Sequence, residues 1–275
     1  MLPERMGDRW VWNDEAFRGV NTVDGVYNRL NLVGARAAVV GPYYLPYDVS
    51  ALQLASSVGP RGIVYSIDTQ GRRSSPPTRE FECVSGGGNS TKLGEQLQLL
   101  RNFGVPLAPF EWLEDSEITY FPPPAQNLDV IVDHGSLEFI GTSSLKRFHR
   151  RAVETIIGAL RPGGLWIHHA STRTLLDVCK AASFNGDDPF RVWVNGLGIR
   201  VVRVDIPRDS YRIPAPDAAL EKFIWSRDSQ YIVGEGSSPD GRRMFMVGNG
   251  SLLFPEPLIV HPQKHIFVVQ KIALT

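Results

Sequence analysis

The stretch from Ala37 to Asp68 constrains the fold more than any other part of the chain. An apolar run over 37–40 leads into Gly41, a helical segment follows, and a second apolar run ends in Asp68. A strand, a helix and a second strand in this order predict a βαβ unit with parallel strands. The acidic residue that ends the second strand of such a unit is placed to bind the two hydroxyls of a ribose. The layout therefore favours an enzyme that binds a nucleotide cofactor.

The turn after Gly41 departs from this layout, because residues 42–47 read Pro-Tyr-Tyr-Leu-Pro-Tyr where glycines are expected. Glycine lets the backbone approach a ligand closely, whereas a proline removes an N–H donor and fixes φ at about −65°. The tyrosines fill space that a ligand would need. Asp48 is placed to cap the following helix, which argues against a pyrophosphate, and so against NAD or FAD, at that helix N-terminus. The turn predicts that cofactor binding is altered or lost.

The composition excludes several classes of function. Lys plus Arg and Asp plus Glu number 29 each, so the zero net charge favours neither a nucleic acid nor an anionic membrane surface as partner. Two cysteines, Cys83 and Cys179, are too few for a disulfide framework or a metal knuckle. No apolar run reaches the roughly 20 residues that span a bilayer, and the first residues lack the apolar core of a signal peptide. We therefore expect a soluble, cytoplasmic protein.

Strand and helix signals alternate along most of the chain. The predicted strands cover residues 37–41, 63–68, 107–113, 128–133, 165–168, 199–206 and 266–272. The predicted helices cover residues 48–58, 91–103, 143–160 and 174–182, and Arg-Pro-Gly-Gly at 161–164 is interpreted as the turn that stops the third. Strands separated by helices of this size imply an α/β fold, a mostly parallel sheet with helices on both faces.

Two segments fall outside this alternation. Residues 1–30 read as an N-terminal arm, whose aromatic residues fill a hydrophobic seam or, alternatively, close over a substrate pocket; they are Trp10, Trp12, Phe17 and Tyr27. Residues 207–263 are rich in Pro, Gly and Asp, with strand-like pieces at 231–234 and 243–247 and a turn signal, Ser-Pro-Asp-Gly, between them. We interpret this segment as a β-rich insertion before the last strand of a domain that covers 31–275.

Five segments taken together resemble the class I S-adenosylmethionine-dependent methyltransferases. They are Val39-Val40-Gly41, residues 58–68, Trp112-Leu113-Glu114-Asp115, residues 128–140, and residues 160–165. The resemblance implies a Rossmann-like sheet of seven strands, mostly parallel, with the last strand antiparallel.

The resemblance also implies roles by position. Gly41 and the turn after it, including Tyr43, would face the methionine part of the cofactor, and Asp68 would bind the ribose hydroxyls. Asp115 or Glu114 would meet the adenine amino group. Asp133 and His134, at the end of the fourth strand, would lie near the transferred methyl.

The residues themselves point to acid–base chemistry at the same edge. Asp133, His134 and Glu138 follow a strand whose carboxyl end is where open α/β folds bind ligands. A histidine there can act as a general base, although His134 could instead bond a loop carbonyl and Glu138 cap a helix. His168 and His169 end the fifth strand on opposite faces, so one of them can pair with His134 or Asp133. Three convergent metal ligands are not indicated, so no metal is expected.

Two functions follow from these patterns. The first is an S-adenosylmethionine-dependent methyltransferase that acts on a small molecule, at a hydroxyl deprotonated by His134 or His168. The second is a methyltransferase-fold protein whose cofactor site is closed by the Pro/Tyr turn. It would be a non-methylating enzyme such as a cyclase or lyase, or a partner or scaffold protein. A homo-oligomer or a protein partner fits either.

Overall fold

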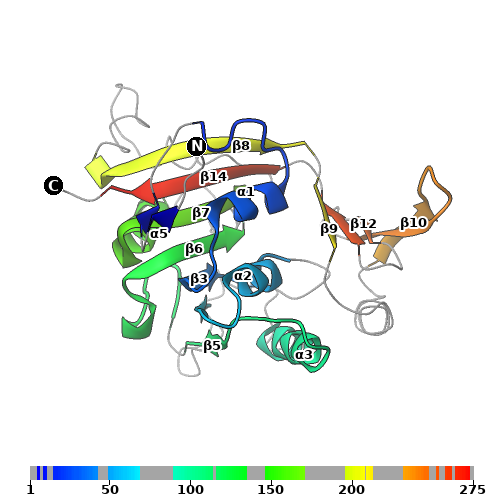
Figure 1. Cartoon of the computed structure of the whole chain (residues 1–275), viewed down its shortest axis with the longest axis horizontal. Helices are drawn as coiled ribbons and strands as arrows, with labels where there is room; N and C mark the ends of the chain where they lie inside the picture. The colour runs from blue at the N-terminus through cyan, green and yellow to red at the C-terminus, as the bar shows by residue number, and fades with distance from the viewer. Residues whose placement is uncertain are drawn as a thin grey trace.

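The computed structural model describes a three-layered α/β body, a sheet between two layers of helices, and a smaller sheet beside it (Figure 1). The residues that it describes are 5–6, 9–10, 15–42, 49–68, 89–113, 116–134, 146–170, 196–207, 209–212, 232–247, 252–253, 258–261 and 264–272. Two short strands near the start, β1 (Arg5–Met6) and β2 (Arg9–Trp10), pair with each other.

The main sheet has seven strands in the order β5-β4-β3-β6-β7-β14-β8. Their bounds are β3 Arg36–Val40, β4 Ile63–Ile67, β5 Phe110–Trp112, β6 Leu128–His134, β7 Leu160–Ala170, β8 Ile199–Ile206 and β14 Lys264–Lys271. Neighbours from β5 to β7 are parallel, whereas β14 is antiparallel to both β7 and β8. The expected fold class, a seven-stranded, mostly parallel sheet with its last strand reversed, is confirmed.

Helices cover both faces of this sheet. They are α1 (Val23–Leu30), α2 (Ser50–Val58), α3 (Asn89–Asn102) and α5 (Lys146–Ala159), with a 3-10 turn, η3, at Pro123–Ala125. Alternate residues of the strands feed two separate apolar clusters. One joins α1, α2 and α3 to residues such as Val39 and Val132, and the other joins α5 to residues such as Ile131 and Trp166. Phe17 and Tyr27 are buried in the first cluster, as the seam interpretation expects.

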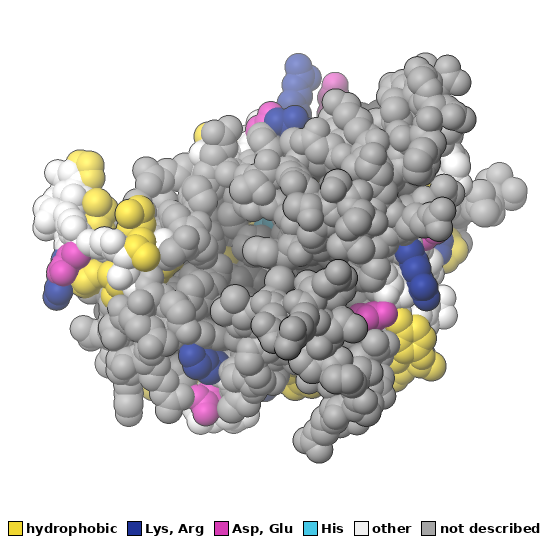
Figure 2. Space-filling model, turned by 180° about the vertical axis from the view of Figure 1, so that it is seen from behind, with side chains coloured by type: hydrophobic (Ala, Val, Ile, Leu, Met, Phe, Trp, Pro, Cys, Tyr) yellow, Lys and Arg dark blue, Asp and Glu magenta, His cyan; other side chains and the backbone are white. Residues whose placement is uncertain are grey.

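The β-rich insertion forms a sheet of its own before β14. Its strands are β9 (Asp209–Arg212), β10 (Ile232–Ser237), β11 (Arg243–Val247), β12 (Leu252–Leu253) and β13 (Leu258–His261), antiparallel in the order β10-β11-β12-β13-β9. Phe245, Val247 and Leu253 join the cluster that contains α1, α2 and α3. The outer face is apolar as well, since Val233 and Met246 are exposed, and Figure 2 shows hydrophobic side chains gathered at this projecting end.

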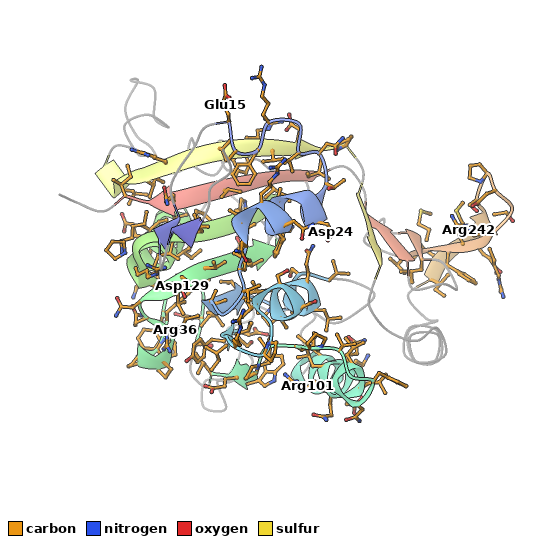
Figure 3. All side chains as sticks on the ribbon, in the orientation of Figure 1. Glu15, Asp24, Arg36, Arg101, Asp129 and Arg242 are labelled. Carbon is orange, nitrogen blue, oxygen red and sulfur yellow. The ribbon has the colours of Figure 1, made fainter. Side chains whose placement is uncertain are left out.

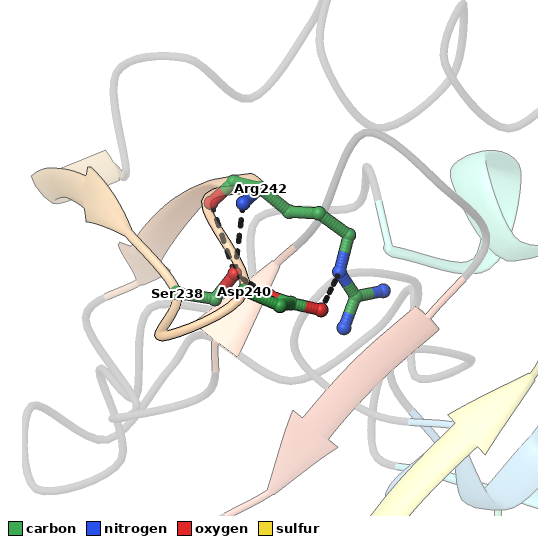
Figure 4. A network of polar contacts seen from close by, with 3 residues as sticks. All are labelled: Ser238, Asp240 and Arg242. Atoms are coloured by element: carbon green, nitrogen blue, oxygen red, sulfur yellow. Dashed lines mark hydrogen bonds and ion pairs between the residues drawn. The ribbon is translucent and has the colours of Figure 1, made fainter.

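The predicted Ser-Pro-Asp-Gly turn closes the β10–β11 hairpin (Figure 4). The backbone N–H of Gly241 donates to the carbonyl of Ser238 at 2.8 Å, and Gly241 has a φ of +80°. The Ser238 hydroxyl accepts the backbone N–H of Arg242, whose Nε also donates to Asp240 at 2.7 Å. Hydrogen bonds of its own side chains therefore stabilise the turn.

Two local predictions were wrong. The second helix begins at Ser50 with Val49 at its N-cap and without a side-chain cap, so Asp48 is not the cap residue. The strand predicted over 165–168 is β7, and it begins at Leu160 rather than Leu165. Residues 161–164 form a bulge within it rather than a free turn, because Leu128 of β6 pairs with Leu160 and Val130 pairs with Leu165. A Cβ on Gly164 would lie 2.9 Å from the Leu128 carbonyl oxygen, which explains the glycine. The helix predicted over 174–182 lies outside the described residues.

A partly buried polar cluster ties the amino ends of three strands together (Figure 3). The Asp129 carboxylate pairs with the Nε of Arg161 and accepts the backbone N–H of Arg36 at 2.7 Å. The guanidinium of Arg36 donates to the Pro124 carbonyl and lies 4.9 Å over the ring of Tyr65. This edge lies opposite the carboxyl ends of the strands, so we assign the cluster to stability.

We expect Asp129→Asn to lower the free energy of unfolding by about 1–3 kcal/mol, because it removes the negative charge that pairs with the partly buried guanidinium of Arg161. Urea unfolding followed by circular dichroism measures the change. Asp205→Asn is the matched control, since its pair with Arg203 is exposed and should contribute about 0–1 kcal/mol. Equal losses in the two variants would contradict the assignment.

A second prediction concerns the contact between α1 and α2. Gln53 Nε2 donates to Asp24 Oδ1 at 2.7 Å, and partial desolvation at this contact raises the pKa of Asp24 above its usual 3.8, against the opposing effect of the Gln53 bond. A raised folded pKa contributes stability that is present below the unfolded value and lost as the pH rises through the folded value. Asp24→Asn should therefore gain stability relative to the wild type between about pH 3 and about pH 7. A constant difference across that range in urea titrations would contradict it.

Candidate functional site

The carboxyl ends of the central strands define the edge where the candidate site lies. From β3 the chain proceeds to β4 and β5 on one side of the sheet, and it returns to β6 and β7 on the other side. The strand order therefore reverses between β3 and β6. Open α/β sheets bind ligands at such a switch point, outside the carboxyl ends of the strands.

Asp133 and His168 form a buried pair beside this point. They are direct neighbours in the parallel register of β6 and β7, and Asp133 is in turn the neighbour of Val40 on β3. His168 Nδ1 lies 2.9 Å from Asp133 Oδ2, and both side chains are 0% exposed. An ionised carboxylate only accepts hydrogen bonds, so this contact favours the tautomer with the proton on Nδ1, which leaves Nε2 as the acceptor. Of the two partners proposed for this histidine, the structure brings Asp133 to it.

Aromatic rings surround the imidazole of His168. The ring of Phe267 on β14 stacks on it at 6.2 Å between centroids, and the indole of Trp166 lies 5.4 Å away. All three residues are buried on the face that α5 covers. A carboxylate that orients an imidazole in an apolar setting is an arrangement that can accept a proton at Nε2 and stabilise the resulting charge.

His169 lies on the opposite face, as the alternation along β7 predicted. Its Nε2 is 3.3 Å from the hydroxyl of Tyr27 on α1, and both side chains are buried. Sequence reasoning missed this contact, since Tyr27 was interpreted only as one of the aromatic residues of the N-terminal arm. The contact joins α1 to the end of β7.

Gly41 and Asp68 end the neighbouring strands β3 and β4. Gly41 has a φ of +59°, and its N–H donates to the carbonyl of Ile67 at 2.8 Å, while the next residue, Pro42, is buried. Asp68 is half-buried and donates its backbone N–H to the hydroxyl of Ser116 at 3.0 Å. Ser116 is fully buried and also reaches the Leu113 carbonyl, so it fixes the end of β4 to the segment after β5. No sequence signal had singled out Ser116.

The side chains of several predicted site residues are not described by the structure. Tyr43, Glu114, Asp115 and Glu138 lie outside the described residues. His134 is the last residue of β6 and pairs with His169 in register, but only its backbone is described. Within the described ranges, there is no group of three His, Cys, Asp or Glu side chains that could hold a metal ion. The same part of the chain contains no helix that is long and apolar enough to cross a membrane.

No protein-family model matches the chain, and no curated protein matches it. Solved structures align with it at low identity. The YcgJ protein of Bacillus subtilis has a TM-score of 0.42 at 12% identity, over 91% of this chain and 97% of its own. A precorrin-6y C5,15-methyltransferase of Geobacter metallireducens has 0.41 at 13%, over 89% and 84%. An S-adenosylmethionine-dependent O-methyltransferase of Thermotoga maritima has 0.41 at 12%, over 97% and 74%. At these values no activity of this chain follows from the names.

The geometry of the buried pair predicts a particular tautomer. We expect the neutral tautomer of His168 to carry its proton on Nδ1, because an ionised Asp133 Oδ2 can only accept a hydrogen bond. Nitrogen-15 NMR of imidazole-labelled protein, with His168→Phe to assign the signal, measures the two ring nitrogens. Asp133→Asn should lose this preference and lower the free energy of unfolding by about 1–3 kcal/mol. A proton on Nε2 in the wild type would contradict the prediction.

Proposed function

We propose that the chain is an S-adenosylmethionine-dependent methyltransferase that acts on a small molecule, and that the acceptor is a hydroxyl group. The observation that carries the proposal is the Asp133–His168 pair, which lies at the carboxyl ends of β6 and β7 beside the switch point of the sheet. The number of strands in the main sheet and the reversal of β14 support it, because both are features that the sequence resemblance implied.

The residues around β3 and β4 fit one part of the cofactor. Asp68 is a half-buried carboxylate at the end of β4, with its backbone fixed by Ser116, and a carboxylate there can accept hydrogen bonds from both ribose hydroxyls. We propose Gly41 and Tyr43 for the methionine part and Glu114 or Asp115 for the adenine. When bound, the cofactor supplies a methyl group on a positively charged sulfur.

The acid–base role belongs to His168. Its Nε2 lone pair accepts the proton of the substrate hydroxyl, and Asp133 holds the ring by its Nδ1–H and stabilises the imidazolium that forms. The apolar rings around the pair keep water from competing for that proton. His134, whose backbone adjoins the same edge, is the alternative base.

A second candidate function rests on the backbone of the turn after β3. The N–H of Gly41 is already bonded to the Ile67 carbonyl, and Pro42 has none to offer. The first two positions of the turn therefore offer no backbone donor to a ligand. This favours a methyltransferase-fold protein that no longer binds the cofactor and serves as a cyclase, a lyase or a scaffold for a protein partner.

Calorimetric titration with S-adenosylmethionine and S-adenosylhomocysteine decides between the two functions. We expect micromolar binding by the wild type, and a loss of about tenfold to a hundredfold in Asp68→Ala, because two charge-assisted hydrogen bonds to the ribose disappear. Asp205→Ala, an exposed acidic residue on β8, is the control and should bind as the wild type does.

Wild-type protein that is folded but binds neither compound at millimolar concentration would overturn the proposal and favour the second function. Unchanged affinity in Asp68→Ala would contradict the ribose assignment alone.

A further inference from the structure

Two buried polar atoms on the face of β7 that α5 covers have no hydrogen-bond partner within the described part of the chain. They are Nε1 of Trp166 and Nε2 of His168. Both residues are 0% exposed, and they are two positions apart on the same face of the strand. Their rings lie 5.4 Å apart between centroids, at an angle of 43°. Buried polar atoms almost always have a partner, so two such atoms on touching rings call for an explanation.

The two atoms have opposite requirements. The indole Nε1–H can only donate, whereas His168 Nε2 can accept in the tautomer that the contact between Nδ1 and Asp133 favours. A partner for both must accept one hydrogen bond and donate another through the same small group. A carboxylate or a carbonyl cannot donate to Nε2, and an ammonium cannot accept from the indole. A neutral hydroxyl oxygen satisfies both atoms at once.

We propose that Trp166 Nε1 and His168 Nε2 together bind one hydroxyl oxygen, which accepts from the indole and donates to the imidazole. Both atoms are closed to solvent in the packed state, so entry of the oxygen requires a local rearrangement of the side chains around them. Binding then relieves two unsatisfied polar groups, which favours the occupied state over the closed one.

The source of this oxygen is either a water molecule or the hydroxyl of a substrate. The second case deepens the function proposed above and rests on it: Trp166 would position the acceptor hydroxyl while His168 takes its proton. The first case is independent of that function. Both cases share the same hydroxyl chemistry and the same two side chains.

The test is NMR of the full chain labelled with nitrogen-15 in tryptophan, without any cofactor. Phenol is the probe, and benzene is the matched compound that lacks only the hydroxyl. We expect either a nuclear Overhauser effect between the Trp166 indole proton and a slowly exchanging water, or a saturable shift of that proton with phenol and none with benzene. The water signal alone assigns the site to water, and its displacement by phenol assigns it to a substrate hydroxyl.

Two tryptophan variants test whether Trp166 is the residue that binds the hydroxyl. Trp166→Phe should weaken phenol binding about tenfold, the effect of one lost hydrogen bond, whereas Trp112→Phe on the edge strand β5 should leave it unchanged. If Trp166→Phe does not fold, the comparison of phenol with benzene in the wild type still shows whether the site binds a hydroxyl group. Equal effects of the two compounds, or neither a water contact nor a shift, would overturn the proposal. Because the experiment uses no cofactor, failure to bind S-adenosylmethionine would overturn only the function proposed above.

Discussion

The parallel register of β3, β6 and β7 determines where the polar groups of the candidate site lie. It places Val40, Asp133 and His168 in one row across the sheet, and antiparallel β14 adds Phe267 to the same row. A shift of one residue would move every member of the row to the opposite face. Such a shift would also turn two full sets of apolar side chains away from their helices. The contact between the carboxylate and the imidazole is therefore held by the hydrophobic pattern of the strands, more than by the contact itself.

The polar groups at this edge of the sheet differ from strand to strand. On the β4 side, a half-buried carboxylate stands on a backbone fixed by a buried hydroxyl. On the β3 side, the glycine N–H is used within the sheet and a proline follows. On the β6 and β7 side, a carboxylate and an imidazole are paired and enclosed by aromatic rings. Side chains, rather than free backbone donors, thus make up most of the polar groups described at this edge of the sheet.

Much of the fold could be predicted from the sequence because strand and helix periods differ. The strand predicted over residues 199–206 has those bounds in the structure, as does the one over 243–247. The bulge at 161–164 could not be predicted, since Arg-Pro-Gly-Gly reads as a free turn until β6 supplies its pairing partners. In the site, alternation separated His168 from His169, and Asp133 was one of two partners expected. The contacts made by Tyr27 and Ser116 escaped prediction, because they join residues 142 and 48 positions apart.

The position of β14 has a consequence for the order in which the molecule can assemble. In the main sheet, β8 pairs with β14 and is not a neighbour of β7, although β14 follows both of them in the sequence. During synthesis, β8 therefore waits for a strand that emerges after the whole insertion, and until then the edge of β7 is open. Pairings of such large sequence separation form slowly, and an open, apolar edge invites association with other chains. Within the five-stranded sheet, the β10–β11, β11–β12 and β12–β13 pairs join strands that are adjacent in the sequence and can form in that interval. Val247 and Leu253 complete their burial only against the cluster of the main body.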